Sequence, residues 1–340
     1  MKIAVIGAGI TGLTVAERLK HTADVTVFDK ARGVGGRTAT RRAAPYSFDH
    51  GAQYFVAKSE AFKSFLKPAL NEGVLQRWDA RFAEIDAAGL ASEMSNTKVW
   101  SEEYPHFVGV PGMNAFAKFL SRDKNIKTAT RIGKLVQTAQ PVEGIWELFD
   151  DQNTSCGAYD WVIVTTPPEQ AIELLPKSFS NFEDVSNIEL LPCFSLMLGF
   201  DQDLSLPFDA ALVRNSPISW VAKNSSKPGR PTSCSVLVQS TNDWAKKHVD
   251  DNHEDIQKTL IEECSRLIDI DLSHHKHSAV HRWLYANTVK HRKNNGEPFI
   301  DVEKQMAAVG DWCGNARVES AFLHGDRLAT SLLNRLKPVH

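Results

Sequence analysis

Three glycines within the first twelve residues have the spacing that holds a diphosphate. Residues 7–12 read Gly-Ala-Gly-Ile-Thr-Gly and directly follow the apolar run 2–6, which predicts a buried strand. Gly7 permits a tight turn, Gly9 lets a phosphate approach the backbone, and Gly12 allows the next helix to pack closely on the strand. The start of that helix offers free N–H groups and the positive end of its dipole to phosphates. The spacing therefore predicts a dinucleotide site.

An acidic residue follows at the distance that such a site requires. Residues 24–28 predict a second strand, and Asp29 comes directly after it, 22 residues beyond Gly7. A carboxylate there accepts hydrogen bonds from ribose hydroxyls, and its charge disfavours NADP as the resident nucleotide because it repels a 2′-phosphate. This pattern alone does not separate NAD from FAD.

A second glycine-rich segment follows the acid. Residues 32–38 read Arg-Gly-Val-Gly-Gly-Arg-Thr, so Gly36 allows close backbone approach and Arg37 can neutralise a diphosphate. This segment resembles the second glycine motif of the amine-oxidase superfamily of FAD enzymes. NAD dehydrogenases do not usually carry such a loop here, so the resemblance favours FAD.

A third segment lies near the other end of the chain. Residues 307–313 read Ala-Ala-Val-Gly-Asp-Trp-Cys, and residues 317–321 open a predicted helix over 322–336. This block resembles the C-terminal motif of the same flavoproteins. The resemblance implies that Asp311 binds a ribityl hydroxyl and that the helix N-terminus faces the flavin pyrimidine, where its dipole stabilises negative charge.

The middle of the chain adds strands and a further cofactor contact. Strands joined by turns are predicted within residues 126–166 and resemble those of FAD enzymes with the p-hydroxybenzoate-hydroxylase topology. That resemblance implies that a backbone group near Val136 touches adenine. We expect non-covalent FAD, although Cys313 lies close to Asp311. The expected cofactor-binding residues are Gly7, Gly9, Ile10, Thr11, Gly12, Asp29, Lys30, Gly36, Arg37, Gln53, Val136, Asp311, Val318 and Glu319.

A second group of elements predicts a second part of the chain. Residues 196–200, 218–222 and 233–239 predict strands of another sheet, and residues 60–71 and 255–268 predict helices. We therefore expect an α/β protein in which a Rossmann-type FAD-binding domain is interleaved with a smaller mixed-sheet α+β substrate domain. The expected FAD-binding domain comprises residues 1–56, 100–170 and 285–340, and the expected substrate domain residues 57–99 and 171–284.

The chain as a whole resembles the bacterial branch of the renalase family. The segments that carry this resemblance are residues 29–33, 49–55, 110–113, 219–224, 281–286 (His-Arg-Trp-Leu-Tyr-Ala) and 310–313. The resemblance implies an FAD oxidase that takes a hydride from the 2- or 6-dihydro isomers of NAD(P)H, releases NAD(P)+ and reduces O2 to hydrogen peroxide. Its partners would be a small dinucleotide substrate and oxygen.

The chemistry of the residues agrees with that activity. Oxidation of a dihydropyridine is driven by recovery of aromaticity, so no side-chain base need remove a proton. We therefore assign no side chain as a catalytic residue. Many amine oxidases place a lysine near flavin N5, five residues before an aromatic residue on a strand. Counting back from Phe200 gives Ser195 instead, which weakens an amine-oxidase interpretation.

Five residues are expected to form the substrate pocket. Gln53 and Tyr54 follow the second glycine motif, in a stretch that borders the flavin ring in the superfamily, and a pocket role is favoured over plain packing for Tyr54. Trp220 could cover a planar ring or belong to the sheet core, and Asn224 could bind a carboxamide. His281 lies on a predicted strand, where a structural role is favoured over that of a base.

Two alternatives to the renalase-like activity stay open. One is a flavin amine oxidase of the same fold. The other is a flavin-binding regulatory protein without turnover, because a fold does not establish chemistry. The preferred dihydro isomer, the choice between NAD and NADP forms and the oligomeric state are not readable.

Composition narrows the remaining possibilities. The 39 basic and 41 acidic residues give a net charge of −2, which argues against nucleic-acid binding. No apolar stretch is long enough to span a membrane, and the five dispersed cysteines suit reduced thiols in a cytoplasm. His274, His275 and His277 lack partners at ligand spacing, so we expect a surface loop and no metal site. Residues 224–231 are expected to form a mobile loop.

Overall fold

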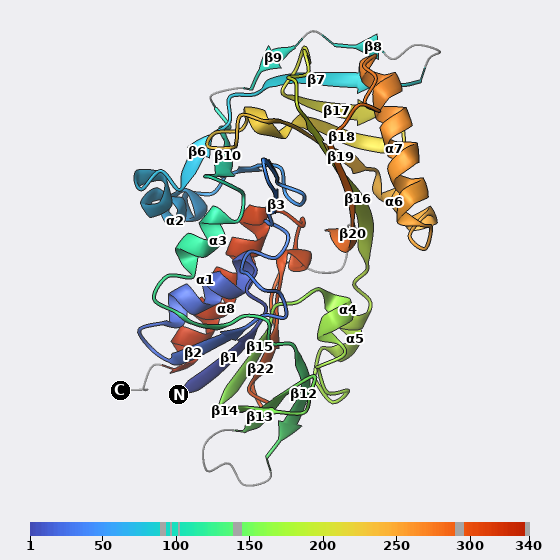
Figure 1. Cartoon of the computed structure of the whole chain (residues 1–340). Coiled ribbons are helices and arrows are strands. Elements are labelled where there is room, and N and C mark those ends of the chain that lie inside the picture. Colours follow the sequence, from blue (N-terminus) through green and yellow to red (C-terminus); the bar gives the residue numbers. More distant parts are fainter. Residues whose placement is uncertain (89–92, 96, 101–102, 139–144, 290–295, 337–340) are drawn as a thin grey trace. The chain divides into compact units, whose positions relative to one another are not determined.

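The computed structural model describes residues 1–88, 93–95, 97–100, 103–138, 145–289 and 296–336 (Figure 1). Contacts divide the chain into two compact units, each assembled from segments far apart in the sequence. The first unit comprises Met1–Gly36, Ala117–Leu190 and Thr288–His340, and the second Arg37–Phe116 and Leu191–Asn287. The two are of similar length.

A six-stranded, mostly parallel sheet forms the centre of the first unit. In spatial order its strands are β11 (Asn125–Lys127), β2 (Asp24–Phe28), β1 (Lys2–Ile6), β15 (Trp161–Val164), β22 (Met306–Ala308) and β21 (Phe299–Asp301). All neighbours run parallel except β21 and β22. Strand β1 is buried from Ile3 onward, as predicted. Ligands of such sheets bind beyond the carboxyl ends of the strands, here the ends of β1, β2 and β15.

Two helices of the first unit pack against each other. They are α1 (Ile10–Leu19) and α8 (Val318–Leu336), drawn side by side in Figure 1. A Cβ on Gly325 would lie 2.9 Å from the backbone oxygen of Thr11, so glycine permits this approach of the two helices. The first and last segments of the chain therefore meet beside the sheet.

An antiparallel meander completes the first unit, together with short helices. Its strands are β12 (Ile132–Gln137), β13 (Trp146–Asp150) and β14 (Ser155–Tyr159). The indole nitrogen of Trp146 donates to the backbone oxygen of Lys304 at 2.7 Å, which ties the meander to the end of the chain. The short helices are α4 (Pro168–Ala171), α5 (Phe182–Ser186) and the 3-10 turn η2 (Asp311–Cys313).

An eight-stranded mixed sheet forms the centre of the second unit. Its strands in order are β20 (His277–Thr288), β16 (Leu190–Phe200), β19 (Cys234–Ser240), β18 (Ile218–Lys223), β17 (Ala210–Arg214), β7 (Arg81–Asp86) and β8 (Glu93–Met94), with β9 (Lys98–Val99) also paired to β7. Strands β17 and β7 run parallel, whereas β16, β19, β18 and β17 are antiparallel neighbours. The predicted second sheet is thus present.

The two faces of this sheet are covered differently. One face, which carries Phe194, Val236 and Val221, forms a large apolar core with α7 (His253–Ile268) and α6 (Asn242–Lys247). On the other face Met197 and Leu237 pack against Tyr46 and Phe48. The helix predicted over 255–268 is α7, and it begins two residues earlier because the Asn252 side chain accepts a hydrogen bond from the backbone N–H of Glu254.

The remaining elements are mostly short. They are β3 (Arg41–Ala43), β4 (Tyr46–Phe48), β5 (Phe55–Val56), α2 (Glu60–Asn71), β6 (Leu75–Arg77), β10 (His106–Gly109), α3 (Ala115–Leu120) and η1 (Asn224–Ser226). Strand β10 pairs with β5 and β6, and β4 contacts β19. Residues 37–56 and 100–116, expected in the FAD-binding domain, therefore belong to the second unit, while residues 171–190 join the first. The helix predicted over 60–71 is α2.

Within the described residues, no helix combines the length and the apolar character needed to cross a bilayer.

Candidate functional site

The turn after β1 requires its glycines for the reasons predicted. Gly7 has a φ of +115°, and a Cβ there would lie 2.5 Å from Oγ1 of Thr165. A Cβ on Gly12 would lie 2.0 Å from the backbone oxygen of Gly7, so helix α1 can pack this closely only through glycine. Gly9 differs, because no described atom lies within 4 Å of its Cβ position. The space above Gly9 is open.

The start of helix α1 can receive an anion. Its N-cap is Gly9, which supplies no side-chain hydrogen bond to the first turn. The second glycine motif lies against this turn: the backbone N–H of Gly35 donates to the oxygen of Ala8 at 2.9 Å. The Cβ position of Gly36 lies 3.6 Å from Cα of Gly9. The structure thus brings the two glycine motifs together around one helix N-terminus.

Asp29 is held rigidly at the end of β2. Its two carboxylate oxygens accept hydrogen bonds from the backbone N–H groups of Ala8 (2.7 Å) and Ala31 (2.8 Å). The segment of residues 127–130 lies beside Asp29, because the backbone N–H of Thr130 donates to the backbone oxygen of Asp29 at 2.9 Å. A carboxylate oriented by two backbone donors keeps acceptor capacity for ribose hydroxyls.

Two further residues of the first unit, Val136 and Lys30, were predicted to contact the cofactor. Val136 stands in β12 opposite Glu147 of the meander, whereas residues 127–130 are the part of that region that reaches Asp29. The Lys30 ammonium donates to the side-chain oxygen of Gln170 at 3.1 Å. Sequence spacing could not find residues 127–130, because their approach to Asp29 depends on strand β11 pairing with β2.

The C-terminal motif forms a compact turn. Asp311 is buried in η2, and its backbone oxygen accepts from Gly314 at 3.0 Å. Trp312 donates its indole N–H to the oxygen of Thr166 at 3.0 Å, which fixes the turn beside the end of β15. Val318 and Glu319 lie in the first turn of α8, as predicted.

The thiol next to this turn is unsuited to covalent attachment. Cys313 is buried, and burial raises the pKa of its thiol to about 12. The thiolate is the nucleophilic form, so this cysteine is inert at neutral pH. Taken with the open space over Gly9 and the uncapped start of α1, the residues of the first unit fit a non-covalently held FAD.

In the second unit, Arg37 is linked to two other segments. Its guanidinium donates to the oxygen of Ala286 at 3.2 Å, and its backbone oxygen accepts from the N–H of Ala52 at 2.9 Å. A Cβ on Gly51 would lie 1.9 Å from that same oxygen, so this position must be glycine. Arg37 therefore anchors residues 49–53 against the end of β20.

A buried ionic cluster that the sequence did not reveal lies behind this segment. Asp49, Lys227 and Arg230 have wholly buried side chains. One carboxylate oxygen of Asp49 accepts from Arg230 (2.6 and 3.2 Å) and from Lys227 (3.3 Å). The other oxygen accepts from Thr40 at 2.7 Å and from the N–H of Met113 at 3.0 Å. We call Asp49, Lys227 and Arg230 the ionic lock. Residues 224–231 are held in place by these buried bonds, so the expectation of a mobile loop is wrong.

The cluster carries more positive than negative charge. In the part of the chain that the structure describes, no second carboxylate pairs with Lys227 or Arg230. Burial raises the pKa of Asp49, but the charges of Lys227 and Arg230 outweigh it and hold the pKa below its ordinary value. Burial lowers the pKa of Lys227 to about 8, against the attraction of Asp49. The only sequence signal was an acid in 49–53 and two cations in a proline-rich loop.

Two predicted pocket residues form hydrogen bonds with members of the ionic lock. Asn224 is completely buried, its Nδ2 donates to the oxygen of Ser47 at 2.8 Å, and its Oδ1 accepts from the N–H of Asp49 at 3.3 Å. The Gln53 Nε2 donates to the oxygens of Asp49 (2.6 Å) and Gly51 (2.9 Å), and its Oε1 accepts from Lys227 at 3.1 Å. Both side-chain amides are therefore hydrogen-bonded within the protein.

Tyr54 and Trp220 lie together in an aromatic cluster, which we define as Tyr54, Trp100, His106 and Trp220. The Tyr54 ring centroid lies 4.9, 4.6 and 5.7 Å from those of Trp100, His106 and Trp220 respectively. Trp100 stacks on His106 at 3.7 Å. Burial lowers the pKa of His106 to about 4, so the ring is neutral at pH 7. The cluster is thus an uncharged, flat-sided group of rings.

His281 lies in a second ring group beside residues 49–53. Its ring centroid is 4.9 Å from that of His50 and 4.4 Å from that of Trp283, whose indole N–H donates to the oxygen of His50 at 2.7 Å. Burial lowers the pKa of both histidines, and that of His50 to about 4. Both rings are neutral at pH 7, so neither carries charge to a ligand.

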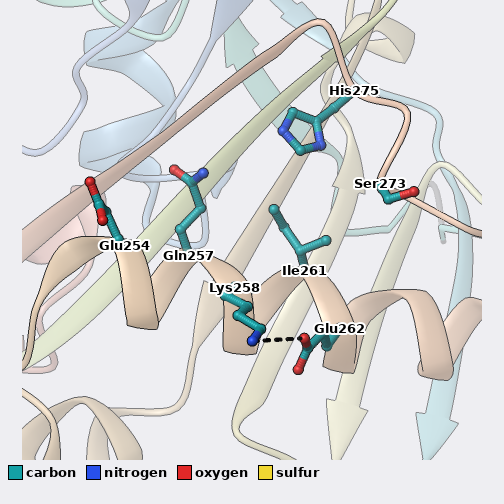
Figure 2. Close-up of a pocket in the computed structure, with 7 residues that line it drawn as sticks. All are labelled: Glu254, Gln257, Lys258, Ile261, Glu262, Ser273 and His275. Atoms are coloured by element: carbon teal, nitrogen blue, oxygen red, sulfur yellow. Dashed lines mark ion pairs between the residues drawn. The ribbon is translucent and has the colours of Figure 1, made fainter.

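The three clustered histidines are not one loop. His277 lies in β20 with its ring 5.5 Å from that of Phe48, so its expected place in a surface loop is wrong. His275 lies instead at a surface hollow of about 310 Å³ (Figure 2). The hollow is lined by one side of α7 and by Ser273, and its charges include the pair Lys258–Glu262 at 4.0 Å. It contains none of the predicted site residues.

Comparison with known proteins places the chain in a family. The model of the flavin containing amine oxidoreductases matches residues 82–333, and that of an NAD(P)-binding Rossmann-like domain matches residues 5–69. The chain belongs to the flavin-containing amine oxidoreductase family. It is a flavin-dependent oxidoreductase of the amine oxidase superfamily, and its cofactor is non-covalent FAD.

Individual relatives agree with this family. Mouse renalase (Mus musculus) is 22% identical over 333 residues, which cover 91% of this chain and 92% of renalase. The fold matches cyclohexylamine oxidase from Brevibacterium oxydans IH-35A, with a TM-score of 0.76, 12% identity and coverage of 98% and 99% of the two chains. It also matches an oxidoreductase from Methanosarcina mazei, with a TM-score of 0.69, 14% identity and coverage of 98% and 100%.

Proposed function

We propose that this protein is an FAD-dependent oxidase of the 2- or 6-dihydro isomers of NAD(P)H. The reaction consumes the dihydronicotinamide, O2 and one proton, and releases NAD(P)+ and hydrogen peroxide. The substrate loses a hydride, which is one proton and an electron pair, and oxygen gains the electron pair and two protons. The similarity to renalase over nearly the whole of both chains supports this choice within the family.

The observation that carries the proposal is the uncharged aromatic cluster of the second unit. Its rings offer flat apolar surface to a planar dihydropyridine, and the neutral His106 adds no charge. When bound, FAD supplies the acceptor for the hydride and passes the electron pair to oxygen. The protein then needs to orient the ring and exclude water, which rigid aromatic side chains do.

The first unit supplies the residues that hold the cofactor in this proposal. The N-terminus of α1, with Gly9 and Gly36 beside it, binds the diphosphate, and Asp29 binds the adenosine ribose. Asp311 binds the ribityl chain, and the start of α8 stabilises negative charge on the isoalloxazine.

Position 195 distinguishes this chain from many amine oxidases. Ser195 lies in β16 opposite Gln239 of β19, and it is completely buried. Its short hydroxyl replaces the lysine that many amine oxidases carry on this strand. A dihydronicotinamide gives up a hydride without any proton abstraction, so the absence of an amine at this residue suits the proposed substrate.

One observation favours a second candidate, oxidation of an amine. Aromatic rings also bind ammonium groups through cation–π attraction, and the family model is that of amine oxidoreductases. The aromatic cluster alone does not separate a cationic amine from a planar pyridine. The distinction therefore has to come from substrates.

Anaerobic mixing of the flavin-loaded protein with single substrates tests the proposal. We expect rapid bleaching of the visible flavin band by the 2- or 6-dihydro isomer, slow bleaching by ordinary NADH, and none by a panel of primary and secondary amines. Air should restore the colour with one hydrogen peroxide per NAD+ released. Bleaching by amines alone would establish the second candidate, and no bleaching at all would leave a flavin-binding protein without this turnover.

A further inference from the structure

One face of the eight-stranded sheet carries a row of three polar side chains. Ser195 of β16, Gln239 of β19 and Trp220 of β18 are aligned by the strand registers. Laterally paired residues share a face of a sheet, so the three side chains lie on the face opposite to α7. The Gln239 Nε2 donates to the oxygen of Gly51 at 2.8 Å. Residues 49–54 therefore lie over this row.

The indole N–H of Trp220 is an unpaired donor in this row. Trp220 is 8% exposed, and its Nε1 is buried without a hydrogen-bond partner among the described residues. A buried donor left unpaired costs about 1–3 kcal/mol, so its retention calls for an acceptor from outside the chain. Nearby ring contacts come from Tyr54 at 5.7 Å and Phe82 at 6.3 Å, and neither is a carbonyl or carboxylate acceptor.

Two other polar side chains expected to touch substrate, those of Asn224 and Gln53, are hydrogen-bonded within the protein. The amide of Asn224 bonds to the backbone at Ser47 and Asp49, and the amide of Gln53 bonds to residues 49 and 51 and to Lys227. Asn224 is also completely buried, so its side chain is not presented to a substrate carboxamide. In this row the Ser195 hydroxyl is also buried without a partner among the described residues, but a hydroxyl can donate or accept, whereas the Trp220 indole can only donate.

We propose that the Trp220 indole N–H donates a hydrogen bond to the carboxamide oxygen of the dihydronicotinamide, while Tyr54 packs against its ring. This inference rests on the proposed function and names the residue that selects the substrate. An indole can only donate, so it recognises the carbonyl oxygen of the carboxamide and not its amino group. Trp220 acts in specificity, and the hydride transfer itself needs no proton from it.

The first test uses wild-type, flavin-loaded protein and product analogues that differ at one ring position. Binding of NAD+, its acetylpyridine analogue, its thiocarboxamide analogue and a pyridine dinucleotide without a substituent is measured by titration calorimetry. A donor-only partner predicts similar affinities for the first two, weaker binding of the thiocarboxamide, and about tenfold weaker binding of the unsubstituted analogue, since one hydrogen bond contributes roughly 1.4 kcal/mol. Loss of affinity on replacing the amide by acetyl would overturn the proposal.

The second test removes the donor. Trp220→Phe keeps an aromatic ring, and we expect its preference for NAD+ over the unsubstituted analogue to fall from about tenfold to about onefold. Trp78→Phe is the matched control, because the Trp78 indole N–H already donates to Oγ of Ser226 at 3.1 Å. Its preference should stay at the wild-type value. Flavin uptake and thermal unfolding establish that both variants fold.

The two levels of the proposal fail differently. If wild-type protein is reduced by a dihydro isomer and Trp220→Phe keeps the full preference, the assignment of Trp220 is overturned and the proposed function stands. If wild-type protein binds none of the dinucleotides and no dihydro isomer reduces it, both are overturned. Because the first test needs no variant, a misfolded Trp220→Phe does not rescue the proposal.

Discussion

The glycine turn of the first unit and the ionic lock of the second solve the same problem with different parts of the chain. The turn positions its ligand groups through backbone, and Gly7 and Gly12 are there because a Cβ would collide with Thr165 or with Gly7. The lock, formed by Asp49, Lys227 and Arg230, positions residues 49–53 through buried charged side chains. The glycine turn is a short motif that can be recognised in the sequence. The lock joins residues about 180 positions apart and has no such motif.

The difference teaches where each region is vulnerable. A backbone site tolerates no added volume but carries little net charge of its own. A buried ion pair is strongly destabilised when one partner is lost, because the remaining charge stays in a medium that solvates it poorly. The two regions should therefore respond to different substitutions, and these responses can be ranked.

The largest effect should come from removing the acid of the lock. Asp49→Asn keeps the shape of the side chain but leaves Lys227 and Arg230 buried without a counter-charge. We expect the free energy of unfolding to fall by about 3–5 kcal/mol. Urea unfolding at pH 7 measures this loss directly.

The matched control is an acid of the same unit whose partner is exposed. Asp209 pairs with Arg81 at 3.0 Å, and the arginine side chain is nearly half exposed. Asp209→Asn should cost about 1 kcal/mol or less. Equal losses in the two variants would show that burial of the lock has no energetic consequence.

How far the sequence predicts this fold depends on the range of the signals. The glycine turn, strands β1 and β2 and helix α2 follow from residues within about thirty positions of one another, and each was predicted. Residues 37–56 were assigned to the FAD-binding domain but belong to the second unit, because β4 packs against β19 and β5 pairs with β10. Long-range pairing of this kind has no local pattern.

The second largest effect should come from Asn224, which separates a structural role from a ligand role. Asn224→Ala leaves the oxygen of Ser47 and the N–H of Asp49 without their buried partner. We expect a loss of about 2–3 kcal/mol in the free energy of unfolding, with the affinity of the folded protein for NAD+ unchanged. Chemical unfolding and calorimetric titration of the same preparation measure both quantities.

Asn287→Ala serves as the reference for this loss, since its exposed side chain bonds only to Asn242 among the described residues. That substitution should change stability by about 0.5 kcal/mol or less. A drop in NAD+ affinity without a drop in stability for Asn224→Ala would restore the original expectation that Asn224 binds the carboxamide.

A third, smaller effect should distinguish Gly12 from Gly9, since alanine at the first should lower stability and alanine at the second should lower FAD affinity. Gly12→Ala places a Cβ 2.0 Å from a backbone oxygen that cannot move freely, and we expect a loss of about 1–3 kcal/mol in stability. Gly9→Ala meets no described atom within 4 Å, so its stability should be within about 0.5 kcal/mol of wild type. Its FAD affinity should nevertheless fall about tenfold or more, because the methyl group occupies the approach of the diphosphate.

Unfolding of the flavin-free variants and FAD titration followed by flavin fluorescence separate these outcomes. If Gly9→Ala binds FAD as tightly as wild type, the open space above Gly9 is not the diphosphate site. The glycines and Asp29 were thus predictable from local spacing, whereas the cluster of Asp49, Lys227 and Arg230 was missed because Asp49 lies about 180 positions from the two cations. The indole N–H of Trp220 became informative only when the structure showed that Asn224 was already engaged.

The smallest effect is a pH dependence that belongs to the lock alone. Burial lowers the pKa of Lys227 in the folded protein to about 8, below its ordinary value of 10.5. Between these two values the unfolded chain binds more protons at this site than the folded protein does. Stability therefore gains a contribution that rises with pH through this window, by at most about 1.4 kcal/mol per pH unit. The groups facing the amine are Asp49, Arg230, the Gln53 amide and the Trp78 ring.

Lys227→Met removes this contribution while Arg230 still neutralises Asp49. The difference in free energy of unfolding between wild type and Lys227→Met, measured in urea at pH 7, 8 and 9, should shift in favour of wild type as pH rises. Other titrating groups cancel in that difference, because both proteins carry them. Parallel curves would mean that the Lys227 amine keeps its proton as easily as a solvated lysine does. Residues 224–231 would then behave as the hydrated loop that their composition suggests, and the contrast between a backbone site and a charged lock would reduce to a contrast in burial alone.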